Sequence, residues 1–282
     1  MKKITRRSFM AAAGLTVAAL ALTACGGSSS TASSAAASSV ASSAAASSEA
    51  ASAAATELTT VEAGKLTMAT NAAFPPYEMT TDAGEFEGID IETAQAIADK
   101  LGLELQIDDM DFDAALLSVQ QGKADIVMAG VTVTDERKAV MDFSDSYATG
   151  IQSIIVPEGS DIASPDDLAG KKIGTQRGTT GYIYCSDDFG DDSVVAYDDG
   201  LTAVQALNNG QVDAVVIDNA PAKEFVAANP GLVILDTSYA EEDYAIGMAK
   251  GSSLEDAVNA ALEELKADGT LQSIVDKYIT AE

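Results

Sequence analysis

The sequence contains no histidine, and only two of its 282 residues are cysteines, Cys25 and Cys185. Without histidine, a Ser-His-Asp or Cys-His catalytic set is excluded, and so is a histidine-ligated metal site. Because Cys25 lies in a segment with the marks of an export signal, Cys185 has no partner and we expect no internal disulfide. The sequence predicts neither a metal nor a cofactor.

Basic residues are scarce, since 16 Lys and Arg oppose 44 Asp and Glu and give a formal net charge of −28. Four of the basic residues lie at the N-terminus: Lys2, Lys3, Arg6 and Arg7. Their removal with a signal would take the charge to −32. Such a surface repels nucleic acid and anionic lipid and favours solubility, so we expect no nucleic-acid partner.

Residues 1–24 have the order of a signal peptide, with basic residues before an uncharged stretch from Ser8 to Ala24. The stretch is too short for a membrane span, which needs about 20 apolar residues. The Leu22–Cys25 quartet resembles the lipobox of bacterial lipoproteins, in which the cysteine is diacylated and becomes the first residue of the mature chain. This resemblance implies export and a lipid anchor at Cys25 on the outer face of the cytoplasmic membrane. The Arg6-Arg7 pair leaves both the general and the twin-arginine export routes open.

Residues 25–57 are almost entirely Ser, Ala and Thr and cannot bury a core. We interpret them as a flexible tether. About 225 residues follow, which is enough for two modest domains. Hydrophobic runs alternate with helical periodicity there, which predicts α/β units with mostly parallel strands, the first strand running from Leu66 to Thr70.

An internal repeat is the most informative feature of this part. The segment Ala114–Gly130 recurs as Thr202–Asp218, each copy reading as helix, glycine, aspartate and buried strand. Two copies of one unit suggest two lobes of the same architecture. Helices near 254–267 and 270–279 are expected to return to the first lobe. We therefore predict lobe 1 from 58–150 and 243–282, lobe 2 from 151–242, and a two-segment hinge near Tyr147–Ile151 and Glu242–Ile246.

Five motifs resemble those of the polar amino-acid-binding proteins of ABC importers, the family 3 bacterial extracellular solute-binding proteins. They are Ala72–Glu78, Gly84–Ile91, Asp111–Asp113, Ala129–Arg137 and Asp142–Tyr147. The resemblance covers residues 58–282 and implies a two-lobed periplasmic-binding-protein fold of type II. It also implies that the protein is a monomer, is not an enzyme, and has as partners a free amino acid and a transmembrane permease.

A free amino acid carries a carboxylate and an ammonium on one carbon, and Arg137 suits the carboxylate because a guanidinium forms paired, charge-assisted bonds. By resemblance, Thr132 and Thr180 donate to the carboxylate, the Gly130 carbonyl accepts from the ammonium, and Asp218 is its counter-charge. Other interpretations stay open at this point. Arg137 could pair with Glu136 on the surface, Asp218 could cap the following helix, and Thr180 could merely begin one.

Four further residues would contact the ligand side chain: Phe74 and Phe112 as walls, and Asn71 and Gln176 where the resemblance places selectivity. Phenylalanines more often pack in cores. Because both selectivity positions hold neutral amides, a neutral polar ligand such as glutamine, or cystine, is favoured. Glu78 keeps a basic amino acid possible, although it, Tyr77 and Tyr244 are more often structural.

Two other functions compete with transport. A dehydratase-like or cell-wall lytic enzyme on the same scaffold would need a catalytic acid in the cleft, for which Glu78, Asp90 and Asp218 are the candidates. A ligand-sensing co-receptor would share the binding site and differ only in its membrane partner.

Overall fold

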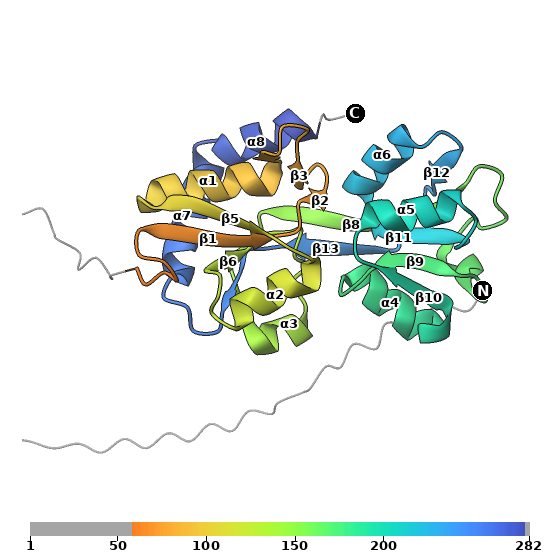
Figure 1. The fold of residues 1–282 in the computed structure, drawn as a ribbon, viewed down its shortest axis with the longest axis horizontal. Helices are drawn as coiled ribbons and strands as arrows, with labels where there is room; N and C mark the ends of the chain where they lie inside the picture. Colours follow the sequence, from red (N-terminus) through yellow and green to blue (C-terminus); the bar gives the residue numbers. More distant parts are fainter. Residues whose placement is uncertain (1–57, 280–282) are drawn as a thin grey trace, which may run out of the picture. The chain divides into compact units, whose positions relative to one another are not determined.

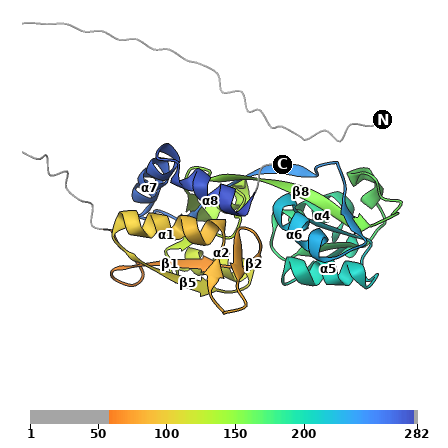
Figure 2. The same ribbon diagram turned by 90° about the horizontal axis from the view of Figure 1, so that it is seen from above.

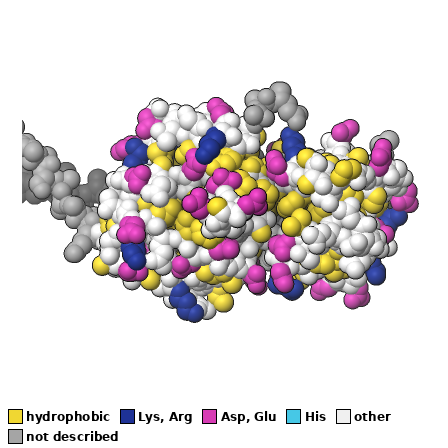
Figure 3. All heavy atoms as spheres, turned by 45° about the horizontal axis from the view of Figure 1, so that its top comes forward, with side chains coloured by type: hydrophobic (Ala, Val, Ile, Leu, Met, Phe, Trp, Pro, Cys, Tyr) yellow, Lys and Arg dark blue, Asp and Glu magenta, His cyan; other side chains and the backbone are white. Residues whose placement is uncertain are grey.

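The structure is a computed structural model and describes residues 58–279, which belong to one compact unit. The predicted signal peptide, the tether and the lipidation site at Cys25 lie outside the described residues. Within 58–279, no helix is long and apolar enough to cross a membrane. On the face shown in Figure 3, acidic side chains are spread over both halves of the molecule and basic ones are isolated.

Lobe 1 is built on a sheet with the strand order β5-β1-β6-β14-β7 (Figure 1). In that order its strands are Glu104–Asp109, Lys65–Thr70, Ile126–Val127, Gly247–Ala249 and Met141–Phe143. β1 pairs parallel with β5 and β6, whereas β14 comes late in the chain and pairs antiparallel with β6 and β7. β1 is buried over five of its six residues, as expected for a strand covered on both faces.

Helices cover both faces of this sheet. They are α1 (Ile89–Leu101), α2 (Phe112–Gln120), α3 (Asp135–Val140), α7 (Glu255–Ala267) and α8 (Thr270–Tyr278). α1 buries Ile91, Ala94 and Ala98 in the core and ends at Gly102, whose φ of 69° is the left-handed conformation that closes a helix. α7 and α8 pack on α1 (Figure 2).

Lobe 2 is built on a second sheet with the path β10-β9-β11-β8-β12, and β13 also pairs with β8. These strands are Val194–Tyr197, Ile173–Gln176, Ala214–Asp218, Ala148–Pro157, Leu232–Ile234 and, for β13, Ala240–Tyr244. Its helices are α4 (Thr180–Phe189), α5 (Gly200–Asn208) and α6 (Asn219–Ala228), with short 3-10 turns at Pro165–Leu168 and Asp191–Ser193. In Figure 1, α4 lies on the opposite side of this sheet from α5 and α6.

The two copies of the internal repeat fold alike. Each is a helix, α2 or α5, followed by a glycine with positive φ, an aspartate and a buried strand. The Asp125 carboxylate accepts from the Thr67 N–H at 2.7 Å, and that of Asp213 accepts from the Lys172 N–H at 2.7 Å. In each lobe this aspartate therefore ties the repeat strand to its parallel neighbour, β6 to β1 and β11 to β9.

Two paired segments connect the lobes. β8 begins at Ala148 and β13 ends at Tyr244, and these two residues are antiparallel partners. Tyr244 also forms an isolated β-bridge with Thr132 of lobe 1. The two predicted crossings fall on these segments, while the domain limits at residues 150 and 243 stay a prediction.

Candidate functional site

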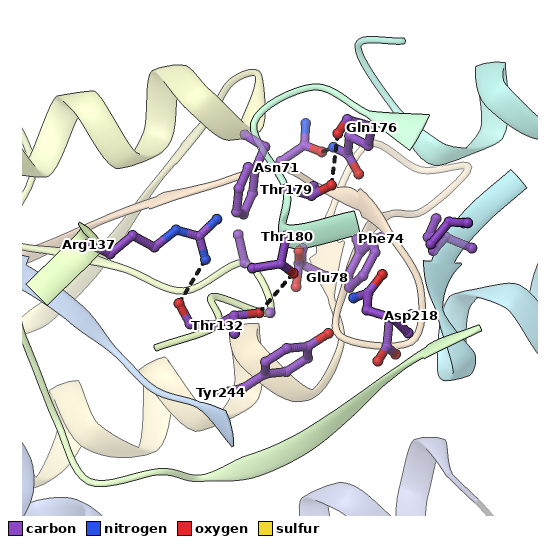
Figure 4. A pocket seen from close by; sticks show the side chains of 16 residues that line it. Asn71, Phe74, Glu78, Thr132, Arg137, Gln176, Thr179, Thr180, Asp218 and Tyr244 are labelled. Atoms are coloured by element: carbon purple, nitrogen blue, oxygen red, sulfur yellow. Dashed lines mark hydrogen bonds between the residues drawn. The ribbon is translucent and has the colours of Figure 1, made fainter. Parts of the chain in front are cut away.

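One pocket collects polar side chains from both lobes (Figure 4). All nine residues that the sequence singled out line it: Asn71, Phe74, Phe112, Gly130, Thr132, Arg137, Gln176, Thr180 and Asp218. Several of them follow or end strands, since Asn71 comes after β1, Gln176 ends β9 and Asp218 ends β11. The carboxyl ends of parallel strands meet at one edge of a sheet, which explains the convergence. Their roles in binding stay a prediction.

Arg137 reaches the pocket from α3. Its backbone N–H is capped by the Thr134 hydroxyl, and its guanidinium donates to the Thr132 carbonyl at 2.7 Å and to the Gly178 carbonyl at 3.1 Å. The guanidinium also lies over the Phe112 ring, 5.4 Å from its centroid. Burial lowers the pKa of Arg137, and the negative charge of Glu242 opposes this shift. Its guanidinium thus faces the pocket and not the neighbouring surface acids.

Glu242 is hydrogen-bonded to residues of both lobes. Its Oε2 accepts from the hydroxyls of Thr132 and Thr180, each at 2.9 Å, and from the Gln152 amide at 3.1 Å. Thr132 belongs to lobe 1, Thr180 and Gln152 belong to lobe 2, and Glu242 lies on the connecting strand β13. Because both threonine hydroxyls donate to Glu242, a ligand carboxylate would be received by backbone N–H groups and by Arg137.

Two glycines shape the wall around these groups. Gly130 has a φ of +55°, and a Cβ there would lie 2.9 Å from Cε1 of Phe74. Gly178 has a φ of +74°, and a Cβ there would lie 3.2 Å from the Cβ of Asp113 across the two lobes. Both positions combine a left-handed backbone with a close contact, so larger residues would push the walls apart.

The two neutral amides meet across the lobes. The Gln176 Nε2 donates to the Asn71 Oδ1 at 2.9 Å, and the Asn71 Nδ2 donates to the Met110 carbonyl at 2.9 Å. Arg177, the next residue in the chain, is about half exposed and points to Asp198 on the surface. Arg177 therefore points away from the pocket.

Asp218 caps a helix and also lines the pocket. Its Oδ1 accepts from the Ala220 N–H at 3.0 Å and so caps α6, while its Oδ2 accepts from the Ile151 N–H at 2.7 Å. The same side chain lines the pocket. Burial raises the pKa of Asp218 to about 6, against the lowering effect of the two backbone N–H groups.

Phe74 and Phe112 contribute both to the pocket and to the hydrophobic core. Phe74 and Phe112 line the pocket, and each also belongs to a buried hydrophobic cluster. Phe74 lies on β2 (Ala73–Phe74), the first strand of a small sheet that continues through β3 (Glu78–Thr80) and β4 (Phe86–Glu87). Its ring stacks on Tyr77, which in turn meets the edge of Tyr244. Core packing therefore fixes the orientation of this wall.

An acid pair, Glu78 and Asp90, lies behind the wall. Glu78 lines the pocket and is fully buried, as is Asp90 on α1. The Asp90 Oδ2 accepts from the Gly130 N–H at 3.0 Å and from the Tyr147 hydroxyl at 2.8 Å. Burial, followed by the charge of Asp90, raises the pKa of Glu78 well above its ordinary value, and burial raises that of Asp90 to about 6.

The sequence did not predict the hydrogen bonds that Glu242 and Gln152 make beside the pocket. The pattern that could have indicated a buried Glu242 is the two-residue period of β13. Ala240, Glu242 and Tyr244 are buried there, while Glu241 and Asp243 are exposed. Glu78 and Tyr244, which were considered more often structural, both line the pocket. Among residues 58–279, no group of three or more Cys, Asp or Glu side chains is placed to hold a metal ion.

Two α/β lobes joined by two strands, with a polar pocket at the strand ends between them, define a periplasmic-binding-protein fold of type II, the fold that its structural neighbours share. The model of the "bacterial extracellular solute-binding proteins, family 3" matches residues 66–281. The chain belongs to this family.

Three known proteins show the extent of the similarity. The L-cystine-binding protein TcyJ of Escherichia coli (strain K12) is 33% identical over 226 residues, which cover 78% of this chain and 85% of TcyJ. The arginine-, lysine-, histidine-binding protein ArtJ of Geobacillus stearothermophilus is 34% identical, with a TM-score of 0.74 and coverage of 77% of this chain and 96% of ArtJ. An ancestral arginine-binding protein bound to glutamine is 42% identical, with a TM-score of 0.74 and coverage of 77% and 99%.

Proposed function

We propose that this protein captures a free amino acid outside the cell and delivers it to the permease of an ABC importer, and that its preferred ligand has a basic side chain. The observation that carries the proposal is the charge pattern of the pocket, where Arg137 faces the same cavity as Asp218 and Glu78. An α-carboxylate on Arg137 and an α-ammonium on Asp218 leave Glu78 for one more positive group.

This choice revises the neutral ligand that the sequence favours. A basic ligand needs an extra carboxylate in the pocket, and the selectivity position holds the amide of Asn71 instead. Glu78 also lines the pocket and can supply that carboxylate. The similarity to ArtJ, an arginine-, lysine-, histidine-binding protein, also supports a basic ligand, whereas the ancestral arginine-binding protein is bound to glutamine. A neutral amide such as glutamine is the second candidate, favoured by the Asn71–Gln176 hydrogen bond.

Capture would proceed by closure of the lobes about β8 and β13. The Arg137 lobe binds the amino acid first, and Thr180 and Asp218 of lobe 2 then close on it. Such a ligand favours the closed form only by its higher affinity for that form. Direct contacts between the lobes, from Arg137 to Gly178 and from Gln176 to Asn71, support a closed form of this shape.

Anchoring at Cys25 completes the proposal, because a lipid would keep the capture domain near its permease. Expression in a bacterial host tests it through the distribution between membrane and medium. We expect the wild type in the membrane fraction and the Cys25→Ala variant in the soluble exported fraction. Equal distributions would contradict the anchor.

Isothermal titration of the Cys25→Ala chain with the twenty amino acids and cystine tests the function. We expect saturable binding of arginine or lysine, and unchanged ligand when the mixture is recovered. Absence of binding by every compound would contradict capture, while chemical turnover of a bound one would favour the enzyme alternative. Binding of neutral amino acids alone would contradict the basic ligand and leave capture standing.

A further inference from the structure

The Glu78–Asp90 pair needs a proton. The two side chains come from β3 and α1, both are fully buried, and the charge of Asp90 acts on Glu78. Two carboxylates that interact in a buried site cannot both stay ionised, so one of the two carboxyl groups is protonated. The pair therefore carries one negative charge and one proton.

The proton belongs on Glu78. Asp90 receives the Gly130 N–H and the Tyr147 hydroxyl on its Oδ2, and both bonds favour the ionised form. Neither oxygen of Glu78 has a donor among the described residues. Glu78 is thus a neutral acid that faces the pocket beside a carboxylate that does not.

Burial keeps Glu78 neutral, and the charges that surround it act in the same direction. Those that act on it most strongly are Asp90, Asp109 and Asp218, all of them acids. Tyr77 and Tyr147 also pack here, and burial raises the pKa of each, so both phenols stay uncharged. The guanidinium of Arg137 is held elsewhere by the carbonyls of Thr132 and Gly178. A positive charge beside Glu78 would have to come from the ligand.

We propose that Glu78 is a proton-exchange site, at which a cationic ligand side chain displaces the carboxyl proton into solvent while a neutral amide side chain leaves the proton in place. In the first case the Glu78 O–H bond breaks and the ligand's guanidinium or ammonium pairs with the carboxylate. In the second, the carboxyl keeps its proton and its carbonyl oxygen accepts a hydrogen bond from the amide N–H. The inference rests on the proposed amino-acid site and assigns it a proton-linked choice between basic and neutral ligands.

The affinity for a cationic ligand should therefore depend on pH, and the direction of the change can be stated. Because a cationic ligand must release a proton, its affinity should rise about tenfold per pH unit for as long as Glu78 is protonated in the free protein. The affinity for a neutral ligand should not change through Glu78. Asp218 contributes equally in both cases, since the α-ammonium is common to all amino acids. Selectivity for arginine over glutamine should therefore increase with pH.

Isothermal titration with arginine and glutamine, in phosphate and in Tris buffer between about pH 6 and pH 8, measures the protons released. For the wild type we expect arginine to release about one proton more than glutamine. In Glu78→Gln, which replaces a neutral acid by a neutral amide of the same shape, the two ligands should release equal numbers. Glu241→Gln, an exposed acid on β13, is the matched control and should behave as the wild type.

Equal proton release by the two ligands in the wild type would overturn the inference and leave amino-acid capture intact. Binding of neither ligand would overturn both, and binding of glutamine alone would overturn the inference together with the basic ligand. If Glu78→Gln fails to fold, which its thermal unfolding would reveal, the difference between arginine and glutamine in the wild type decides alone.

Discussion

The two ends of the pocket are built differently. At the end of Arg137, the principal polar groups have hydrogen-bond partners. The guanidinium donates to two carbonyls, and Glu242 accepts from two hydroxyls and an amide. At the other end, two neutral amides bond to each other and Glu78 has no donor among the described residues. Figure 4 shows Arg137 and Thr132 on one side of the pocket and Asn71 with Gln176 at another.

This difference suggests a division of labour. The end of Arg137 is preorganised and suits the part that all amino acids share. The end of Glu78 is held by fewer bonds and can change its charge, which suits the part in which amino acids differ. Substitutions at the first end should therefore affect all ligands alike, and those at the second should affect selectivity.

The largest effect is expected from Arg137→Ala. Paired charge-assisted bonds contribute roughly 1.5 to 3 kcal/mol each, so losing two should weaken binding of every amino acid by roughly a hundredfold to ten-thousandfold. Titration calorimetry measures the loss. Arg177→Ala, which removes a half-exposed guanidinium directed at Asp198, is the control and should bind as the wild type. If Arg137→Ala weakened the binding of only one amino acid, the proposed difference between the two ends of the pocket would be contradicted.

The sequence predicted the Arg137 end better than the other. The motif around Arg137 and the repeat that ends at Asp218 are local patterns, and their strand ends converge for reasons of topology. Glu242 was missed because its importance comes from Thr132, Thr180 and Gln152, which lie far from it in the chain. The acid pair was missed for a similar reason, since nothing in the sequence shows that β3 brings Glu78 beside Asp90.

A second prediction concerns the stability of the ligand-free protein. The pKa of Asp90 is raised from 3.8 to about 6, so its folded form holds a proton more tightly than the unfolded chain does. This contribution to stability is fully present below about pH 4 and is lost as the pH rises through about 6, a change of roughly 3 kcal/mol. Urea unfolding at a series of pH values should show it.

Asp90→Asn should abolish this part of the pH dependence, so that the difference in unfolding free energy between variant and wild type varies with pH. Asp82→Asn, in an exposed turn, is the control, and its profile should run parallel to that of the wild type. A parallel profile for Asp90→Asn would show that Asp90 does not bind its proton more tightly in the folded protein than in the unfolded chain.

Glu242→Ala tests whether the junction of the lobes depends on one carboxylate. The substitution leaves buried donors of Thr132, Thr180 and Gln152 without an acceptor, and we expect a loss of about 1 to 3 kcal/mol of unfolding free energy. Urea unfolding measures it. Glu241→Ala, an exposed neighbour on the same strand, should cost much less, and equal losses would contradict the role of Glu242.

The smallest effect is expected from Gln176→Ala. It removes the hydrogen bond to Asn71, and a neutral bond of this kind contributes about 0.5 to 1.5 kcal/mol. Affinity should fall by roughly twofold to tenfold, unequally for arginine and glutamine, because this end contacts the side chain. Gln205→Ala on the exposed side of α5 is the control. A uniform fall for both ligands would weaken the assignment of selectivity to this end.

The most direct test of the account is a crystal structure of the protein with its amino acid bound. We predict the α-carboxylate on the Arg137 guanidinium, the α-ammonium on Asp218, and the side chain between Phe74 and Phe112 with its end beside Glu78. An amino acid bound in the reverse orientation, or in the neighbouring cleft lined by Tyr77, Lys223 and Tyr278, would contradict it.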